Sequence, residues 1–600
     1  GILNEDTIVC LAHLGSRAFR EISGEVVQTA AYVVRDQHLA QYRGTFDRLV
    51  SGTDVEKSQM LRSGEGRHEG TLASEFCEIP GSPIAYWVSD NVRRLFREGT
   101  PVKRFIATRE GLTTGSNELF LRRWWEVDLQ AIHVRSTSQE DAFAKGSRWF
   151  PYQKGGEFRR WFGNNEFVVD WQDDGRRMKS FSDPSTGRIR SHNYNGTFAF
   201  RQGITWNGIS SGAAAFRLVP QGFMFDAKGP MAFGEEGRLL FVAGFLNSTL
   251  ATHLLSFLAP TLDFKLGKVE ALPIHPSTLH VSDQVEEQVR ELVAIAERDW
   301  NDREISLNFR QHPVLQFDGR SLQENLQLWR QSCVDAVEKT IRLETAINTE
   351  FVSAAGLQGE LDSKSTEAMC VWLRPDEELL SRSLLSYAIG VMMGRWKNEC
   401  GSIDDDGILP VTEEEWFTEE DTAHRTARFV GQVWPSETLQ ENLALLARGL
   451  DGKETVPPLE TVRRYLATGF YKDHLPRADS DPSQCPIPGE PIPIRERTET
   501  CSAGAGSLIL EFATLSHLTG NPVYLKVANK AFQAIWDRRS TLDLVGSGID
   551  AETGMWVSPV TGIGAGIDSF FEYAFKTHIL LSGRVDREER NLSDSFLRIW

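Results

Sequence analysis

The chain has 600 residues, of which 40% are hydrophobic and 25% are charged, and its formal net charge is -18 at pH 7. This length and composition are typical of a soluble globular protein with about three to five domains. They argue against a membrane-spanning chain, because no run approaches the ~18 consecutive apolar residues of a transmembrane helix. The negative total also argues against a protein that coats nucleic acid indiscriminately.

The first 90 residues alternate short apolar runs with polar loops, for example TIVCLAHL at 7–14 and VVQTAAYVVR at 26–35. This alternation favours strands and helices that complete an α/β unit. The chain starts at Gly1 rather than Met, and its first residues have the features of neither a signal peptide nor a transit peptide. We therefore expect this α/β unit, residues 1–95, to be the end of a longer domain.

Residues 96–280 differ from their surroundings in composition. They are dense in aromatic residues, Gly and Arg, with short β-like runs such as FVVDW and FRLV separated by turns. Between 101 and 220 there are 18 Lys and Arg residues against 12 Asp and Glu, a local balance of +6 in an acidic protein. The pattern predicts a mostly β module with a basic surface.

Residues 281–475 have helical periodicity. Apolar residues recur three and four positions apart in QVEEQVRELVAIAERDW at 284–300 and in the long segment that starts at 322. Six prolines between 476 and 493 then exclude a continued helix and predict a boundary, followed by a Gly-rich segment of different character at 476–600.

The seven cysteines are widely scattered and contain no CxxC pair. They are Cys10, Cys77, Cys333, Cys370, Cys400, Cys485 and Cys501. For the first five, this pattern favours reduced thiols of a cytosolic protein, and no metal site is predicted.

Four segments of the first 475 residues carry a family resemblance. They are 13–35 (HLGSRAFREISGEVVQTAAYVVR), 108–127 (TREGLTTGSNELFLRRWWEV), 149–171 (WFPYQKGGEFRRWFGNNEFVVDW), and GITWNGISSG at 203–212 with LAPTLDFKLGKVEALPI at 258–274. In this order they resemble the target-recognition and C-terminal part of adenine-N6 DNA methyltransferases of the PglX type, from BREX phage-defence systems. The resemblance implies double-stranded DNA and other BREX components as partners, S-adenosylmethionine as cofactor, and a bacterial cytoplasm.

A methyltransferase of this kind flips its adenine out of the duplex, so a separate module must hold phosphates and read base edges. Arg and Lys can neutralise phosphates, Arg and Asn can make bidentate base contacts, and Trp can stack or wedge. The predicted DNA-binding residues are Lys154, Arg159, Arg160, Trp161, Asn164, Asn165, Arg201 and Trp206. The alternative for each is structural, with the tryptophans in the core and the arginines solvated.

Two catalytic motifs of the family are missing from this sequence. It has no Gly-rich methyl-donor loop after a strand and no (N/D)PP(Y/F) tetrapeptide, since the single Pro-Pro pair, Pro457 and Pro458, follows Val456. We therefore expect this chain to bind DNA without methylating it unaided.

Residues 476–600 carry a second resemblance, in RERTETCSAGAGSLILEFATLSHLTG and GIDAETGMWVSPVTGIGAGIDSFFEYAFKTHILLSG. These segments are similar to glycoside hydrolase family 47, in particular to ER degradation-enhancing α-mannosidase-like proteins. The resemblance implies part of an (αα)7 barrel, calcium as cofactor and the ER lumen as compartment. Glu499 and Asp568 match acidic catalytic positions, and Glu572 lies one helical turn beyond. Their alternatives are a helix-start carboxylate and an N-cap. Further catalytic and calcium-binding positions of the family have no counterpart here.

The expected fold class is therefore multidomain α/β plus α. It comprises the end of a methyltransferase α/β unit (1–95), a mixed β-rich recognition module (96–280), a helical region (281–475) and a partial (αα) barrel fragment (476–600). Two functional alternatives remain beside DNA recognition. One is a glycan-processing α-1,2-mannosidase-like protein, in which Cys485 and Cys501 could pair. The other is a docking partner that uses the amphipathic helices between 283 and 440.

Overall fold

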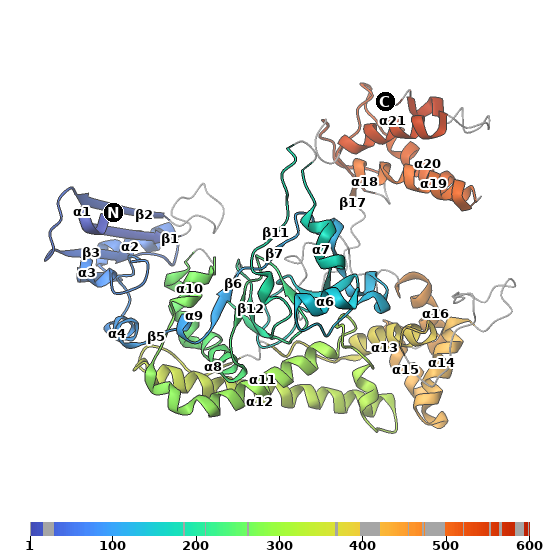
Figure 1. The fold of residues 1–600 in the computed structure, drawn as a ribbon. Helices are drawn as coiled ribbons and strands as arrows, with labels where there is room; N and C mark the ends of the chain where they lie inside the picture. Colours follow the sequence, from blue (N-terminus) through green and yellow to red (C-terminus); the bar gives the residue numbers. More distant parts are fainter. Residues whose placement is uncertain are drawn as a thin grey trace. The chain divides into compact units, whose positions relative to one another are not determined.

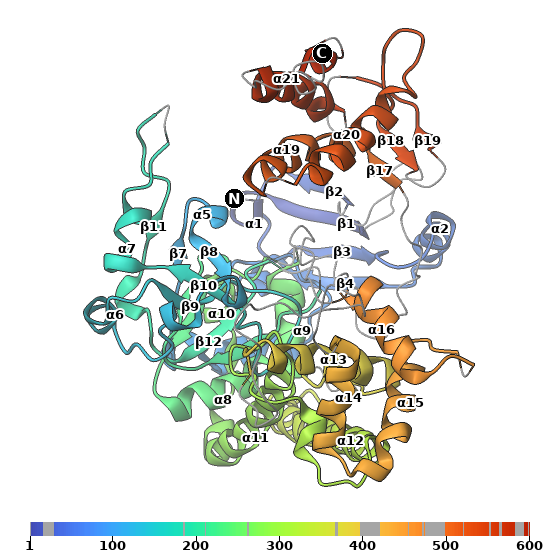
Figure 2. The same ribbon diagram turned by 90° about the vertical axis from the view of Figure 1, so that its right-hand side faces the viewer.

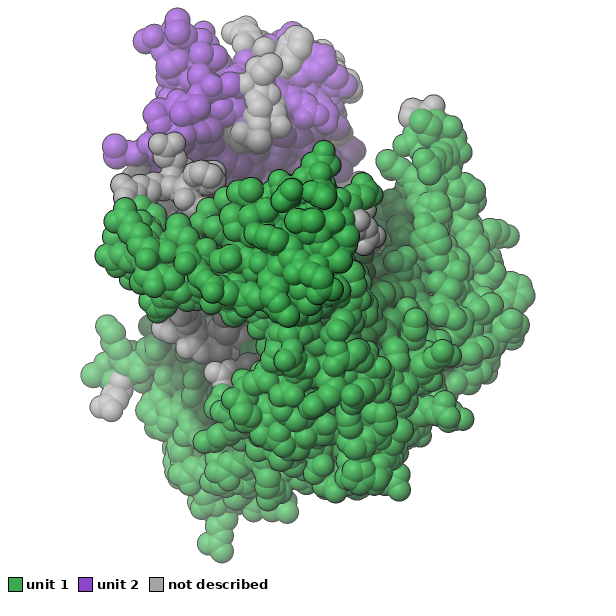
Figure 3. All heavy atoms as spheres, turned by 90° about the vertical axis from the view of Figure 1, so that its left-hand side faces the viewer, with its two compact units in different colours: residues 1–485 green, residues 486–600 purple. Residues whose placement is uncertain are grey.

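A computed structural model describes residues 2–15, 29–183, 186–209, 212–260, 263–366, 370–396, 421–453, 455–470, 473, 499–519, 521–550, 554–562, 567–582, 593–597 and 599. The chain divides into two compact units, residues 1–485 and 486–600, which Figure 3 colours green and purple. Both contain helices and small sheets, so the expectation of a multidomain α/β plus α fold is confirmed in its coarse form. The finer division of residues 1–475 into three domains stays a prediction.

The first unit begins with a four-stranded sheet in the order β2-β1-β3-β4 (Figure 1). Its strands are β1 (Thr7–Gly15), β2 (Thr29–Arg35), β3 (Arg43–Arg48) and β4 (Arg67–Leu72). β1 pairs parallel with β3 and antiparallel with β2. Helix α2 (Asp54–Ser63) lies between β3 and β4 in the chain, and α4 (Asp90–Glu98) comes after β4. The Phe46 ring stacks on Tyr86 at 4.8 Å in the small core beside this sheet.

Two further four-stranded sheets and a two-stranded one form the β-rich part between 100 and 235. One sheet has the order β14-β9-β10-β8, from Met224–Phe225, Trp149–Gln153, Phe167–Asp170 and Leu121–Arg123. Another has the order β13-β12-β15-β6, from Phe216–Val219, Gly203–Trp206, Met231–Phe233 and Ala107–Arg109. A short pair joins β7 (Leu112–Thr113) to β11 (His192–Asn193). Strands this short, separated by turns, agree with the irregular β pattern of the sequence.

Helices form the rest of the first unit. α8 (Glu236–Leu246), α9 (Thr249–Leu258), α11 (Ser282–Asn301) and the 33-residue α12 (Leu322–Ala354) precede α13 (Glu377–Met392), α14 (Thr422–Val433), α15 (Leu439–Gly449) and α16 (Pro458–Thr468). α11 and α12 run side by side in Figure 1. α8 approaches α11 closely at Gly244, where a Cβ would lie 2.8 Å from Val285 Cγ1.

The largest hydrophobic core joins the β-rich part to these helices. It contains Trp206 and Phe216 from the strands together with Phe245, Val289 and Phe351 from the helices, all of them buried. The β-rich part is therefore held on a helical base rather than on a flexible tether. Among the described residues no single helix is long and apolar enough to cross a bilayer. The pair α8 and α9, bent by 70° where the helices meet, together has the length and apolar composition of such a segment.

The second unit has a three-stranded antiparallel sheet and a group of helices (Figure 2). The strands are β17 (Glu499–Cys501), β18 (Gly548–Asp550) and β19 (Trp556–Ser558). The helices are α18 (Ser502–Gly506), α19 (Leu508–Thr519), α20 (Val523–Trp536) and α21 (Asp568–Ser582). Its core is aromatic, with Phe532 stacked on Phe570 at 4.3 Å.

Candidate nucleic-acid interface

The segment 154–165, which holds six of the eight predicted DNA-binding residues, connects β9 to β10. Its backbone is tightly folded, because Gly155, Gly156 and Gly163 have φ values of +99°, +141° and +125°. A side chain at Gly163 would place Cβ 2.6 Å from Arg159 Cδ. Trp161 has φ 71°, which is uncommon for a residue other than glycine, and the surrounding contacts hold it there. The paired glycines thus allow close approach within the protein.

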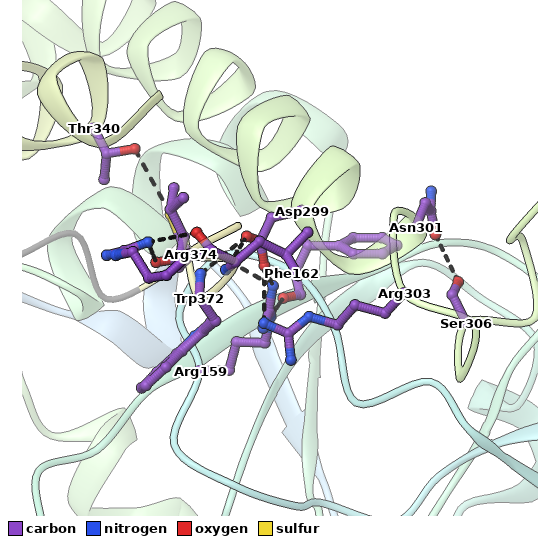
Figure 4. A network of polar contacts seen from close by, with 12 residues as sticks. Arg159, Phe162, Asp299, Asn301, Arg303, Ser306, Thr340, Trp372 and Arg374 are labelled. Atoms are coloured by element: carbon purple, nitrogen blue, oxygen red, sulfur yellow. Dashed lines mark hydrogen bonds and ion pairs between the residues drawn. The ribbon is translucent and has the colours of Figure 1, made fainter. Parts of the chain in front are cut away.

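Arg159 lies in a buried polar network, which Figure 4 shows from close by. Its guanidinium forms an ion pair with Asp299 of α11, with the two side chains 4% and 5% exposed. It also donates to the carbonyl oxygens of Phe162 (3.0 Å) and Cys370 (3.2 Å). The Asp299 carboxylate accepts from two backbone N–H groups at 2.9 Å, those of Trp372 and Leu373. A buried charge with this many partners is fully satisfied and fixes the segment to α11.

Arg303 adds a second cation to this network. It lies 3.5 Å from the Asp299 carboxylate, and burial lowers the Arg303 pKa to about 10, against the raising effect of Asp299. The guanidinium remains protonated at neutral pH at that value. One carboxylate therefore faces two guanidinium groups in the interior of the first unit.

Trp161 and Arg160 attach the same segment to α12. The Trp161 indole N–H donates to Glu344 Oε1 at 2.7 Å, and Arg160 lies 3.6 Å from Glu344 Oε2. The Trp161 backbone also extends the sheet, since its N–H donates to Phe216 O and its carbonyl accepts from Leu218 N. Trp161 is 1% exposed, whereas the Arg160 side chain is 16% exposed.

The two predicted asparagines lie inside the fold. Asn164 is 5% exposed and donates to Glu157 O at 2.9 Å, and Asn165 is 6% exposed and accepts from Gln153 Nε2. Beneath them, burial lowers the pKa of Arg217 to about 10, and burial raises the pKa of Glu166. These are the contacts of a polar interior.

Lys154 and Trp206 occupy different environments. Lys154 Nζ lies 2.7 Å from Asp226 Oδ2, yet 28% of its side chain is exposed at the edge of the segment. Asp226 also accepts from the Tyr152 hydroxyl at 2.8 Å. Trp206 is fully buried and donates its indole N–H to Phe264 O at 2.8 Å. Lys154 can reach solvent, whereas Trp206 belongs to the main core.

Arg201 is exposed, and it shares an aromatic ring with a second arginine. Its guanidinium lies 5.2 Å from the Phe198 ring centre, and that of Arg109 lies 4.6 Å from the same ring. No ion pair holds either arginine within the described part of the chain. Two cations fixed beside one ring, without a neutralising carboxylate, are well suited to an anionic partner.

Sequence reasoning missed most of the exposed cations of this module. In the described residues between 101 and 235, the missed ones are Lys103, Arg104, Arg135, Lys145, Arg148, Arg176, Arg177, Lys179, Arg188, Arg190 and Lys228, whereas exposed Arg201 was predicted. The local charge balance pointed to such a surface, although it could not say which of the basic residues were exposed.

In the second unit, the predicted catalytic positions begin two elements. Glu499 is the first residue of β17, paired with Asp550, and Asp568 is the first residue of α21. The placement of both side chains lies outside what the structure describes, as does Cys485. Glu572 is exposed and pairs with Lys576 at 2.6 Å along α21. The Cys501 thiol accepts from Gly504 N at 3.1 Å and caps α18.

Comparisons with known proteins divide the chain near residue 475, where its composition also changes. An alignment of 500 residues is 36% identical to adenine-specific methyltransferase PglX of Lacticaseibacillus casei (strain Zhang), covering 78% of this chain and 41% of the relative. Residues 1 to about 475 resemble PglX-type adenine-specific methyltransferases. The chain spans about 41% of the length of this PglX relative.

The remainder matches a different family. Residues 472–599 match the model of glycosyl hydrolase family 47. Over 90 residues the chain is 52% identical to ER degradation-enhancing alpha-mannosidase-like protein 1 of Schizosaccharomyces pombe, covering 15% of this chain and 11% of the relative. A solved structure of the Type IIL restriction-modification enzyme MmeI in complex with DNA aligns with 60% of this chain and 44% of that chain at 10% identity, with a TM-score of 0.32.

Proposed function

We propose that residues 1–475 are the DNA-recognition portion of a site-specific adenine-N6 DNA methyltransferase of the PglX type, joined to a mannosidase-like fragment. The similarity to PglX over 78% of the chain carries this proposal. The local balance of +6 between 101 and 220 supports it, because phosphate neutralisation dominates the affinity of most DNA-binding proteins. The proposed partners are double-stranded DNA and other BREX components, in a bacterial cytoplasm.

Within this proposal, the predicted residues divide by exposure into two roles. Lys154 and Arg201 reach solvent and are proposed to contact phosphates, with Arg109 beside Arg201. Arg159 and Trp161 are buried and are proposed to position the segment 154–165 from below. Arg160, Asn164, Asn165 and Trp206 belong with that supporting group, since their polar atoms face the interior.

The two family resemblances also imply cofactors. S-adenosylmethionine would supply the methyl group in a complete methyltransferase, whose donor loop has no counterpart in these residues. Calcium is implied by family 47. In the described part of the chain, no group of three His, Cys, Asp or Glu side chains converges to hold a metal ion. The helices α19, α20 and α21 are proposed to be part of an (αα) barrel.

Salt-dependent DNA binding tests the main proposal. Fluorescence anisotropy of the full chain with a labelled 30-base-pair duplex should show an affinity that falls linearly on a log–log plot as salt rises. Lys154→Gln and Arg201→Gln should each reduce the slope by about 1, because each removes one phosphate contact. Glu291→Gln, a change of an exposed side chain on α11, is the control. Absence of duplex binding at 50 mM salt would refute the proposal.

The family 47 match supports a second candidate, recognition of mannose oligosaccharides by residues 476–600. The ER lumen is the compartment that this likeness implies. Binding of a high-mannose glycan should then be lost in Asp568→Asn and retained in Lys576→Gln. Equal binding by both variants, or no binding by the parent chain, would exclude this candidate.

A further inference from the structure

A two-stranded hairpin stands out from the recognition module in both Figure 1 and Figure 2, beside β11 and α7 (Gln172–Lys179). Its described residues are 181–183 and 186–194, which are called the arm below. Asp183 N donates to Arg188 O at 2.8 Å and Arg190 N donates to Phe181 O at 2.9 Å, with a bridge between Ser182 and Ile189. The arm is therefore an antiparallel ribbon with its own backbone hydrogen bonds.

The base of the arm is fixed to the module. Phe181 packs edge-on against Phe120 at 5.4 Å, and the Ser191 hydroxyl donates to Met178 O at 2.6 Å. Within the arm, β11 (His192–Asn193) pairs with β7 of the module. Gly115 lies against its second strand, where a Cβ would be 2.9 Å from Arg190 Cβ. These contacts orient the ribbon, so it is a rigid projection at its base.

The second strand of the arm presents a row of polar and aromatic side chains. Arg188, Arg190, His192 and Tyr194 alternate along it and are all exposed, whereas Ser191 is 6% exposed. Alternate residues of an extended strand point to the same side. His192 stacks on Tyr194 at 5.4 Å, close to the base. The row thus runs from arginines far from the base to aromatic rings near it.

The charges of the arm are only partly neutralised within the protein. Arg190 pairs with Asp183 across the ribbon at 3.3 Å, and this carboxylate also accepts from Thr186 N. Arg188 has no ion pair in the described residues. Ile189, between the two arginines, is 49% exposed. A ribbon that exposes cations and an isoleucine, and buries neither, contributes little to the core of the protein.

We infer that the arm enters the major groove of duplex DNA. This inference rests on the proposed DNA-recognition function. The major groove is about 12 Å wide and admits a two-stranded β-ribbon. Arg188 and Arg190, which point to the same side of the strand, have the chemistry for bidentate contacts to guanine O6 and N7. His192 and Tyr194, nearer the base, are placed to contact the sugar-phosphate backbone.

The test compares charge-matched double variants of the full chain. Arg188→Gln/Arg190→Gln removes two cations from the arm, and Arg238→Gln/Arg290→Gln removes two exposed cations from α8 and α11. At 50 mM salt the arm variant should bind a mixed-sequence 30-base-pair duplex at least about tenfold more weakly, with a salt slope reduced by about 2, while the control pair changes little. Far-ultraviolet circular dichroism should be the same for all three proteins.

Two further readouts separate groove insertion from phosphate contact. Arg188→Lys/Arg190→Lys keeps both charges but not the bidentate geometry, so it should retain the salt slope and lose sequence preference. The parent chain should compete with methyl green, a major-groove dye, and the Gln variant should not. Unchanged binding by the Gln variant overturns the inference and leaves the DNA proposal standing. Weaker binding without competition for the dye overturns groove insertion. No DNA binding by the parent chain overturns both.

Discussion

Replacing Asp299 by asparagine should destabilise the first unit by about 3–5 kcal/mol. The amide keeps the shape of the side chain and can still accept from Trp372 N and Leu373 N, but it removes the charge that Arg159 faces. Breaking one side of a buried ion pair leaves the other charge unpaired, which typically costs that much. Because Arg303 loses the same counter-charge at 3.5 Å, we expect the upper half of the range.

Urea unfolding followed by tryptophan fluorescence measures this loss, since the Trp300 ring lies 5.2 Å from the Arg159 guanidinium. With a slope of about 3 kcal/mol per molar, the unfolding midpoint should fall by about 1 M or more. The control is Glu291→Gln, which breaks the exposed pair between Glu291 of α11 and Lys339 of α12 and should cost ~0–1 kcal/mol.

A double variant tests whether the lost stability comes from the unpaired charge of Arg159. Arg159→Met/Asp299→Asn also removes the charge of Arg159, and its amide can still accept from Trp372 N and Leu373 N, so it should recover part of the lost stability although Arg303 stays without its counter-charge. If Asp299→Asn and Glu291→Gln shift the midpoint equally, the buried network does not hold the segment 154–165 on α11.

Three other predictions concern stability and association. Burial lowers the His312 pKa to about 3, so as the pH falls the unfolded chain binds a proton at His312 before the folded chain does. The free energy of unfolding should therefore fall by about 1.4 kcal/mol per pH unit below pH 6.5. His312→Asn keeps an acceptor for Val314 N and should make the denaturant midpoint less dependent on pH between pH 7 and 5. Gly244→Ala should lower the thermal midpoint of the first unit, because the new Cβ would lie 2.8 Å from Val285 Cγ1. In the second unit Leu542 and Met555 are 77% and 70% exposed, and we expect such exposed apolar side chains to promote self-association. Leu542→Lys/Met555→Lys should therefore reduce self-association in sedimentation velocity, and an unchanged sedimentation profile would contradict a role for these two side chains.

The sequence predicted regular elements better than it predicted exposure. Periodicity over 284–300 located α11 within two residues of its bounds, Ser282–Asn301, because amphipathic spacing is a local property. The environment of Arg159 could not be read locally, since its carboxylate partner, Asp299, lies far along the chain. The same holds for Trp161, whose acceptor is Glu344 of α12. A basic and aromatic segment has the same composition whether it faces DNA or a buried carboxylate.

The sequence contains a hairpin signal for the arm, which our sequence predictions did not use. DPSTG at 183–187 combines the residue types of a tight turn, between the extended flanks at 181–182 and 188–190. That pattern is typical of a hairpin, and the alternation of Arg188 and Arg190 would have placed both on one side. Projection from the module, in contrast, depends on where β7 and Phe120 lie, and those contacts are tertiary.

Selection from a random duplex pool tests the central claim most directly. The full 600-residue chain is incubated with the pool at 100 mM salt, and bound duplexes are recovered, amplified and sequenced over several rounds. Recognition of DNA by residues 1–475 predicts enrichment of one short motif, which weakens when the arm variant Arg188→Lys/Arg190→Lys is used. A bound pool with the same sequence composition as the input, or no recovered DNA, would contradict the account.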